Sequence, residues 1–176
     1  MDENLLHWHN DNVLCVALSR CNGHVASGGE GGSILIHSTN SNKVEYRADN
    51  VFAEGVSGLC YLPNGSLVAC GYDDGGDGPF LKVFSPSLEL VQTLVGDYVY
   101  CVTVSPSGSH FASGDGPGKV MIWSESGEGG EWVRVQVLED HTSYIWAVCF
   151  SPDGKQLATG SYKHVGLTHQ LSLHSI

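Results

Sequence analysis

The sequence predicts an all-β chain made of four copies of one antiparallel meander, and three observations support this prediction. Glycine is frequent, at 23 of 176 residues, whereas proline occurs six times, a balance typical of many tight turns. A small residue followed by glycine closes an apolar run about every 43 residues, at Ser27-Gly28, Cys70-Gly71, Ser113-Gly114 and Thr159-Gly160. No segment has the apolar spacing of a long helix.

Each repeat begins with two strands joined by a tight turn. The predicted first strands are the alternating apolar runs 13–19, 56–62, 99–105 and 144–151. A turn glycine follows in each repeat, at Gly23, Gly65, Gly108 and Gly154, and the second strands then cover 25–27, 67–70, 111–113 and 157–159. This succession of run, glycine turn and run is the pattern of a β-hairpin.

A third and a fourth strand complete the meander. The predicted third strands are 34–36, 81–84 and 120–123, and the weaker fourth strands are 43–47, 90–94 and 133–138. The repeats therefore cover about residues 5–48, 49–95, 96–139 and 140–176. The last repeat is degenerate after Lys163, because 164–176 has room for a third strand but not for a fourth.

The last repeat carries the strongest sequence signature. Its residues 139–161 read EDHTSYIWAVCFSPDGKQLATGS. This segment resembles the repeat of the WD-repeat β-propeller family, and the shared spacing of four units extends the resemblance over nearly the whole chain. The resemblance implies four-stranded antiparallel blades stacked radially. Because rings of this family usually have about seven blades, four blades imply an incomplete, open ring.

The repeats depart from the family pattern in their polar residues. The family joins a His before the first strand, a Ser or Thr on the second, an Asp in the next turn and a Trp on the third in one hydrogen-bonded set. No repeat here has all four: the third has Ser113 and Trp123 but Asp97 and Pro117, the second has Asp74 but Cys70 and Phe84, and the fourth has His141 and Thr159 but Lys163. We therefore expect stability to rest mainly on apolar packing between sheets.

An open ring leaves an apolar face bare at each of its two ends. A repeat array gains stability from its neighbour interfaces, so each missing neighbour costs one interface of buried area. We therefore expect the chain to be a fragment or short isoform of a longer propeller, or to pair with another copy or with a partner.

Composition narrows the classes of partner and compartment. The chain is 41% apolar, enough for a core, and its formal charge of -11 disfavours nucleic acid and anionic membranes as partners. Residues 1–9 contain no basic cluster or long apolar run that would indicate a signal peptide or an anchor. Six cysteines occur singly, mostly in apolar runs, as reduced thiols do, which predicts a cytoplasmic or nuclear protein.

One end of the predicted meanders is acidic. Because strand direction alternates, the fourth-to-first connections lie at the same end as the second-to-third connections. That end collects eleven acids against one base, Lys163: Asp11, Glu30, Asp49, Glu54, Asp73, Asp74, Asp77, Asp97, Asp115, Glu139 and Asp140. Phe52, Tyr72, Tyr98, Tyr144 and Trp146 lie near the same strand ends.

Carboxylates among aromatic rings suit a Lys- or Arg-bearing protein segment, through charge-assisted hydrogen bonds and cation–π contacts. The predicted partner-binding residues are Asp73, Asp74, Asp77, Asp97, Asp115, Asp140, Tyr98, Tyr144 and Trp146. A second interpretation stays open, in which the acids are a solvated rim that keeps a glycine-rich β protein soluble.

The resemblance and the acidic end together predict a non-catalytic scaffold for protein partners. The sequence has no nucleophile elbow, phosphate-binding loop or HExxH motif, and we predict no cofactor and no resident metal. The scattered histidines, of which His7 and His9 are a close pair, are interpreted as surface residues, and Cys15, Cys60, Cys101 and Cys149 as core thiols at related positions. The alternative function is a Ca²⁺-dependent module or a propeller enzyme that uses the loop 73–77, whose three carboxylates could contribute to a Ca²⁺ site.

Overall fold

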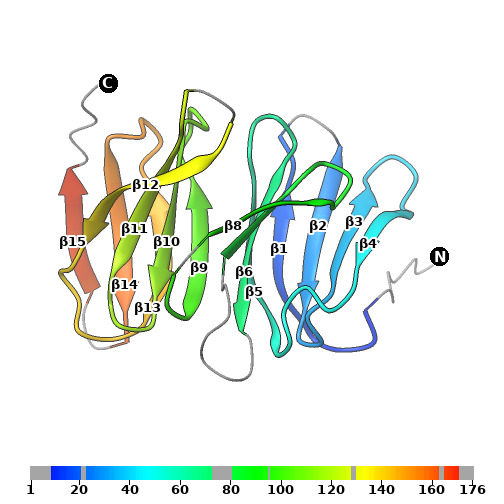
Figure 1. The fold of residues 1–176 in the computed structure, drawn as a ribbon, viewed down its shortest axis with the longest axis horizontal. Helices are drawn as coiled ribbons and strands as arrows, with labels where there is room; N and C mark the ends of the chain where they lie inside the picture. The colour runs from blue at the N-terminus through cyan, green and yellow to red at the C-terminus, as the bar shows by residue number, and fades with distance from the viewer. Residues whose placement is uncertain are drawn as a thin grey trace, which may run out of the picture.

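The computed structural model describes residues 9–20, 23–72, 81–94, 96–127, 130–162 and 165–170. These residues form four antiparallel sheets and contain no helix. The sheets lie side by side in chain order, with the first and the fourth sheet on opposite flanks (Figure 1).

Each sheet is a meander whose strands pair in chain order. The first sheet contains β1 (Val13–Leu18), β2 (His24–Gly29), β3 (Ile34–Ser38) and β4 (Val44–Ala48), and the second contains β5 (Gly55–Tyr61), β6 (Leu67–Tyr72), β7 (Leu81–Phe84) and β8 (Leu90–Leu94). The third contains β9 (Val99–Val104), β10 (His110–Asp115), β11 (Val120–Glu125) and β12 (Trp132–Leu138), and the fourth contains β13 (Ile145–Phe150), β14 (Gln156–Ser161) and β15 (Val165–Gln170). The all-β prediction is confirmed, and β15 is the third strand that the degenerate last repeat was expected to allow.

The sheets stack through their first strands. β1 packs against β5, β5 against β9 and β9 against β13, while β2, β6 and β10 also contact the first strand of the following sheet. This is the radial stacking of propeller blades. The ring is open, because the described residues place no sheet between the fourth and the first (Figure 1).

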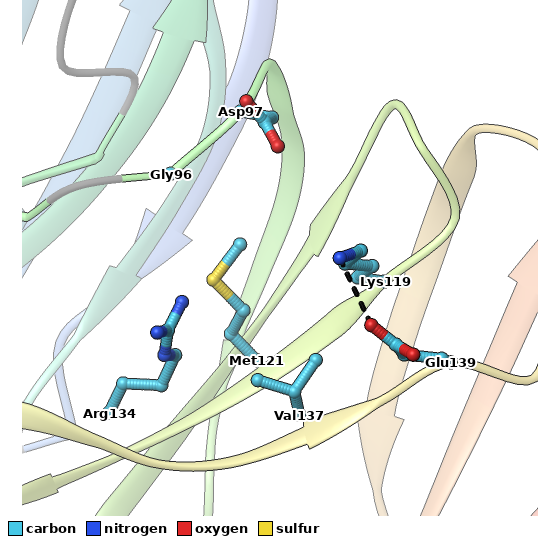
Figure 2. Close-up of a pocket in the computed structure, with 7 residues that line it drawn as sticks. All are labelled: Gly96, Asp97, Lys119, Met121, Arg134, Val137 and Glu139. Atoms are coloured by element: carbon cyan, nitrogen blue, oxygen red, sulfur yellow. Dashed lines mark ion pairs between the residues drawn. The ribbon is translucent and has the colours of Figure 1, made fainter.

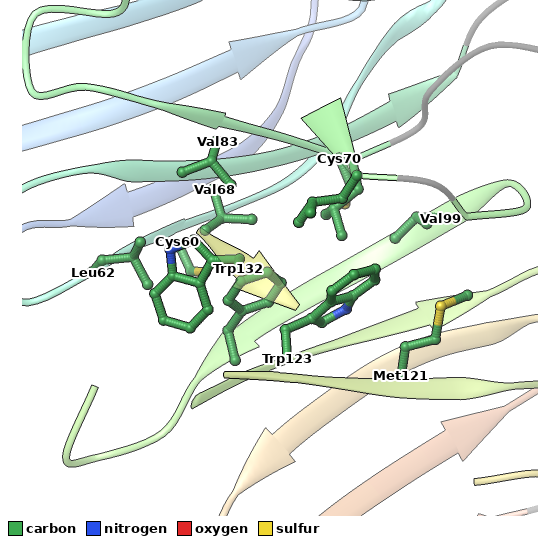
Figure 3. Close-up of a cluster of buried hydrophobic side chains, with 12 residues drawn as sticks. Cys60, Leu62, Val68, Cys70, Val83, Val99, Met121, Trp123 and Trp132 are labelled. Carbon is green, nitrogen blue, oxygen red and sulfur yellow. The ribbon is translucent and has the colours of Figure 1, made fainter. Parts of the chain in front are cut away.

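Three apolar cores fill the spaces between consecutive sheets. Phe52 lies in the first core, and Phe111 and Trp123 stack in the second with ring centroids 5.8 Å apart (Figure 3). The third core contains Ile145 and Leu157. Since burying one such side chain contributes about 1.5–3 kcal/mol, the interfaces between sheets are the main source of stability.

A side-chain hydrogen bond crosses each interface at the same place. The Cys15 thiol donates to the carbonyl of Val56 at 3.2 Å, and the Cys101 thiol donates to the carbonyl of Ile145 at 3.3 Å. Between the second and third sheets the donor is the Ser57 hydroxyl, which bonds the carbonyl of Val99 at 3.1 Å. Each bond joins two consecutive first strands, so it fixes the position of one sheet along the next.

A glycine opposite the thiol makes this close approach possible. Cys15 pairs with Gly28 and Cys101 with Gly114, whereas the second sheet has the two types exchanged, with Gly58 opposite Cys70. A Cβ on Gly28 would lie 2.7 Å from the Cys15 sulfur and 2.6 Å from the Val56 side chain. The glycine after the small residue is therefore required by packing between sheets.

The strand pairing corrects two of the sequence predictions. In the second sheet Ala69 and Cys70, and not Cys70 and Gly71, occupy the small-residue and glycine positions, because Leu59 pairs with Ala69 as Val102 pairs with Ser113. The four first-strand cysteines also fall into two sets, Cys15 with Cys101 and Cys60 with Cys149. Cys70-Gly71 also reads as a small residue followed by glycine, which hid this shift of one residue.

The two equivalent glycines of the third and fourth sheets test the packing role. A Cβ on Gly114 would collide with the Ile145 side chain and lie 2.9 Å from the Cys101 sulfur, whereas on Gly160 its nearest neighbour is the Cβ of Ala147 at 3.7 Å. We expect Gly114→Ala to lower the free energy of unfolding by about 1–3 kcal/mol. We expect Gly160→Ala to leave it unchanged or slightly raised. Chemical denaturation of both variants measures the difference, and equal losses would contradict the packing role.

Candidate functional site

Three chain segments meet at one corner of the third and fourth sheets. The turn between β10 and β11 lies between the connection that enters β9 and the connection that enters β13, since the Gly116 N–H donates to the carbonyl of Tyr98 at 2.8 Å. On its other side, a Cβ at Gly118 would lie 2.6 Å from the carbonyl oxygen of His141. The second-to-third and fourth-to-first connections therefore share one end, as predicted from strand alternation.

An aromatic cluster lies where β9 and β13 come together at this end. Tyr100 lies 5.4 Å from Tyr144 and 4.9 Å from Trp146, measured between ring centroids, and Tyr144 lies 6.4 Å from Trp146. Trp146 is 53% exposed and Tyr144 is also exposed. Burial, followed by the neighbouring Tyr144 and Tyr98, raises the pKa of Tyr100, so the Tyr100 phenol stays neutral near pH 7.

Tyr100 belongs to this cluster but is not among the residues predicted from the sequence. A β-bulge lies near the start of each first strand, at the second residue of β1, β9 and β13 and the third of β5, where the pairing skips Leu14, Tyr100, Trp146 and Ser57 respectively. A bulged residue is re-aimed relative to simple alternation. Aligning the repeats could have identified Tyr100, because Tyr100 and Trp146 occupy equivalent positions in consecutive repeats.

The predicted acidic residues of this corner differ in exposure. Asp97 and Asp140 are exposed, on the connections that enter β9 and β13, and Tyr98 is exposed beside Asp97. Asp115 is fully buried instead: one carboxylate oxygen accepts the N–H groups of Gly118 at 2.9 Å and Lys119 at 2.6 Å, and the other has no partner. The prediction that Asp115 is a surface contact is therefore wrong, because its carboxylate is used inside its own turn.

Several acids at this end are also engaged within the chain. Arg47 donates to Asp49 at 2.8 Å, and Lys119 pairs with Glu139 at 3.0 Å. Asp11 accepts the N–H of Gly31 at 2.7 Å. The prediction of a single base at the acidic end is wrong, because Arg47 and Lys119 lie at the relevant strand ends.

A pocket of about 380 Å³ adjoins the corner, between the connection that enters β9 and the strands β11 and β12. Its lining is Gly96, Asp97, Lys119, Met121, Arg134, Val137 and Glu139 (Figure 2). Between the second and third sheets, the Gln92 side chain on β8 bonds both the N–H and the carbonyl of Trp132, at 2.8 and 2.9 Å. The apolar Met121 and Val137, with charges of both signs around them, suit the stem and polar end of one long side chain.

Hydrogen-bonded sets inside three of the sheets correct the interpretation of the histidines. His9 bonds Ser27 at 2.8 Å, and Ser27 bonds His37 at 3.1 Å. His141 bonds Thr159 at 2.8 Å. In the third sheet the Trp123 indole donates to Ser113 at 2.9 Å.

The side chains of His9, His37 and His141 are buried, so these residues are not surface histidines. Burial, and then the charge of His9, lowers the pKa of His37. His37 occupies the place of Trp123. Each lies on a third strand and pairs with the residue two positions before the serine of the second strand.

Several predicted residues lie outside the described part of the chain. They are His7, Asp73, Asp74, Asp77 and Lys163, with the loop 73–77 of the Ca²⁺ alternative and most of 164–176. Within the described ranges no group of three or more His, Cys, Asp or Glu could hold a metal ion. Among the same residues no helix is long and apolar enough to cross a membrane.

The repeats match a known family. The model of the family described as WD domain, G-beta repeat matches residues 3–38, 50–76, 88–124 and 132–165, which together exceed half of the chain. The chain belongs to this WD-repeat family. Each matched segment contains the first and second strands of one sheet, and the segments 88–124 and 132–165 also contain the last strand of the preceding sheet.

Relatives and solved structures agree with this assignment. The chain is 42% identical over 66 residues to the probable cytosolic iron-sulfur protein assembly protein 1 of Sclerotinia sclerotiorum, covering 35% of this chain and 15% of that protein. It is 28% identical over 135 residues to the small ribosomal subunit protein RACK1y of Oryza sativa subsp. japonica, covering 71% of this chain and 38% of that one. A chain in the crystal structure of the mitotic checkpoint complex shares the fold, with a TM-score of 0.79 at 21% identity over 93% of this chain and 50% of that chain. This WD-repeat chain thus spans at most half of these proteins.

The buried carboxylate of Asp115 makes a pH-dependent prediction. Burial, the largest cause, raises the pKa of Asp115 above its usual value of 3.8, so the folded chain binds this proton more tightly than the unfolded chain. Stability from this group is therefore present at low pH and lost as pH rises through the raised pKa. Relative to Asp115→Asn, which has no such proton, the wild-type chain should gain free energy of unfolding as pH falls from 7 towards that usual value. Denaturant titrations of both chains measure this difference, and a difference that stays constant or reverses would contradict it.

Proposed function

We propose that this WD-repeat chain is a non-catalytic scaffold that holds basic segments of protein partners at the corner formed by Asp97, Tyr98, Asp140, Tyr144 and Trp146. The observation that carries the proposal is the exposed aromatic cluster at the same corner as Asp97 and Asp140. Tyr100 contacts both exposed rings, Tyr144 and Trp146. A Lys or Arg side chain over an exposed indole gains about 0.5–1 kcal/mol, and a carboxylate at the rim adds a charge-assisted hydrogen bond.

The family membership supports a protein-interaction role in general terms. The relatives' names refer to an assembly protein, a ribosomal subunit and a checkpoint complex, all of which are multi-protein settings. Five described cysteines are free, and burial raises the pKa of Cys15, Cys60 and Cys101 to about 12, which leaves these thiols unreactive. We accordingly propose an intracellular scaffold of the cytoplasm or nucleus, whose thiols have no catalytic part.

Asp74 and its neighbours in the loop 73–77 are part of the same proposal. In the sequence these residues come directly after β6, as the turn that begins at Gly116 comes directly after β10. Additional carboxylates there would extend the acidic surface along the partner segment.

Charge variants with a matched control test this proposal. Asp97→Asn with Asp140→Asn should weaken binding of a short Arg- and Lys-rich fluorescent peptide and flatten the salt dependence of its affinity, because two long-range attractions are lost. Glu125→Gln with Glu131→Gln changes the net charge equally at the opposite end, where both side chains are exposed, and should leave the peptide's affinity nearly unchanged. Equal losses in both pairs would mean that the peptide senses only net charge and would remove the corner as a site.

The aromatic part has its own variant. Trp146→Ala should weaken binding of the same peptide about two- to fivefold, the range that corresponds to one lost cation–π contact of about 0.5–1 kcal/mol. Trp146→Phe should recover part of the affinity, because a smaller ring keeps a weaker π face. Fluorescence anisotropy at low and high salt measures both variants, and an affinity indifferent to the ring would contradict the role of Trp146.

A further inference from the structure

The first sheet presents an apolar face that no described residue covers. Val16 is 67% exposed and Leu18 is 69% exposed on β1, and Val13 is also exposed. Isolated exposed apolar residues are common, but three on one face of one strand mark a surface that excludes water when a partner binds.

The same three positions are interface positions in the other sheets. Strand pairing makes Val16 equivalent to Leu59, Val102 and Val148, since each pairs with the small residue of its second strand. The complete equivalents are Val56, Leu59 and Tyr61 on β5, Val99, Val102 and Val104 on β9, and Ile145, Val148 and Phe150 on β13. All nine pack into the core shared with the preceding sheet. The face of β1 is therefore the receiving half of an interface that the chain forms three times internally.

The fourth sheet presents the complementary half. Ala147, Cys149 and Ala158 are exposed on β13 and β14. Their equivalents in the first sheet, Cys15, Ala17 and Ala26, pack against the second sheet, and Cys60 and Val68 of the second pack against the third. Cys60 is buried and Cys149 is exposed at equivalent positions because a sheet follows the second but, among the described residues, none follows the fourth.

We propose that a second copy of this chain covers both faces, head to tail, so that the first sheet of each copy packs on the fourth sheet of the other. The partner must offer small side chains to Val16 and Leu18 and bulky ones to Ala147 and Cys149, and the described part of this chain leaves both surfaces uncovered. Eight sheets lie within the range of about four to eight blades that closed rings use. A head-to-tail contact that closes between two copies buries both faces at once.

Charge opposes this association and gives it a signature. Each copy carries a formal charge of -11, so two copies repel, while the contact itself is apolar. Salt screens the repulsion and should therefore strengthen the dimer. This response is opposite to that of a basic peptide at the acidic corner, so the two proposals fail independently.

Sedimentation of the full chain tests the proposal first. The mass should rise with concentration from 18.8 kDa to twice that value, and at a lower concentration in about 500 mM than in about 50 mM salt. A mass that stays at one copy throughout would overturn the proposal and leave the faces to further sheets of a longer chain. Continued growth beyond two copies would overturn the closed dimer.

Complementing variants then test the head-to-tail arrangement. Val16→Lys with Leu18→Lys disables the face of the first sheet, and Cys149→Arg with Ala158→Arg disables that of the fourth. Because all four residues are exposed, both variants should fold, which circular dichroism verifies. Each alone should be monomeric, and an equimolar mixture should recover a two-copy species through the one intact pair of faces. A mixture that stays monomeric, or a fourth-sheet variant that dimerises alone, would overturn the arrangement.

A control and a chemical readout complete the test. Val133→Lys with Val135→Lys places the same two charges at exposed valines of β12, away from both faces, and should dimerise as the wild type does. Alkylation of Cys149, followed by peptide mass spectrometry, should slow as the wild-type concentration rises, because the dimer buries this thiol as the second interface buries Cys60. Unchanged alkylation in a dimeric sample would place the contact elsewhere and overturn the proposal.

Discussion

The contact between one first strand and the next is the interaction on which the rest of the structure depends. Each sheet satisfies its backbone hydrogen bonds internally, but its two apolar faces can be buried only by neighbouring sheets. A glycine opposite Cys15 or Cys101 lets the following strand approach closely, and a thiol or hydroxyl then bonds a carbonyl of that strand. These three bonds set the register between sheets, which apolar packing alone would leave free to slide.

The stacking also builds the candidate site. Tyr100 and Trp146 are far apart in the sequence but occupy the same bulge position on consecutive first strands, so the stacking brings their rings to 4.9 Å. The buried Asp115 holds the turn that lies between the two connections, and Gly118, with φ of +100°, allows that turn to touch His141. An unpaired buried carboxylate oxygen lowers the free energy of unfolding, so holding this turn with Asp115 costs some stability.

Periodicity predicted most of the fold, because turn glycines and alternating apolar runs are local signals that four repeats multiply. It could not place Tyr100, since a bulge changes which face a side chain takes without changing the sequence pattern. It misjudged Asp115 and His9 for a related reason: burial of a polar residue depends on which backbone groups a turn or a neighbouring strand offers. The one-residue shift at Cys70 was hidden because Cys70-Gly71 also reads as a small residue followed by glycine, whereas the glycine of this strand pair lies on the first strand, at Gly58.

The acidic corner and the apolar face of the first sheet lie on different parts of the molecule, and this separation has a physical consequence. Asp97 and Asp140 are exposed at one end of the sheets, whereas Val16 and Leu18 lie on the flank of the first sheet, so an occupant of one surface leaves the other accessible. A glycine-rich β protein with bare faces and an outer strand at each sheet edge would aggregate if it were neutral. The acids to which we propose a basic segment binds would therefore also keep unrelated copies apart, so the solvated-rim interpretation and the proposed site share one charge distribution. Under this view a flank contact forms only where complementary shape outweighs repulsion, which restricts it to surfaces built like the chain's own interfaces.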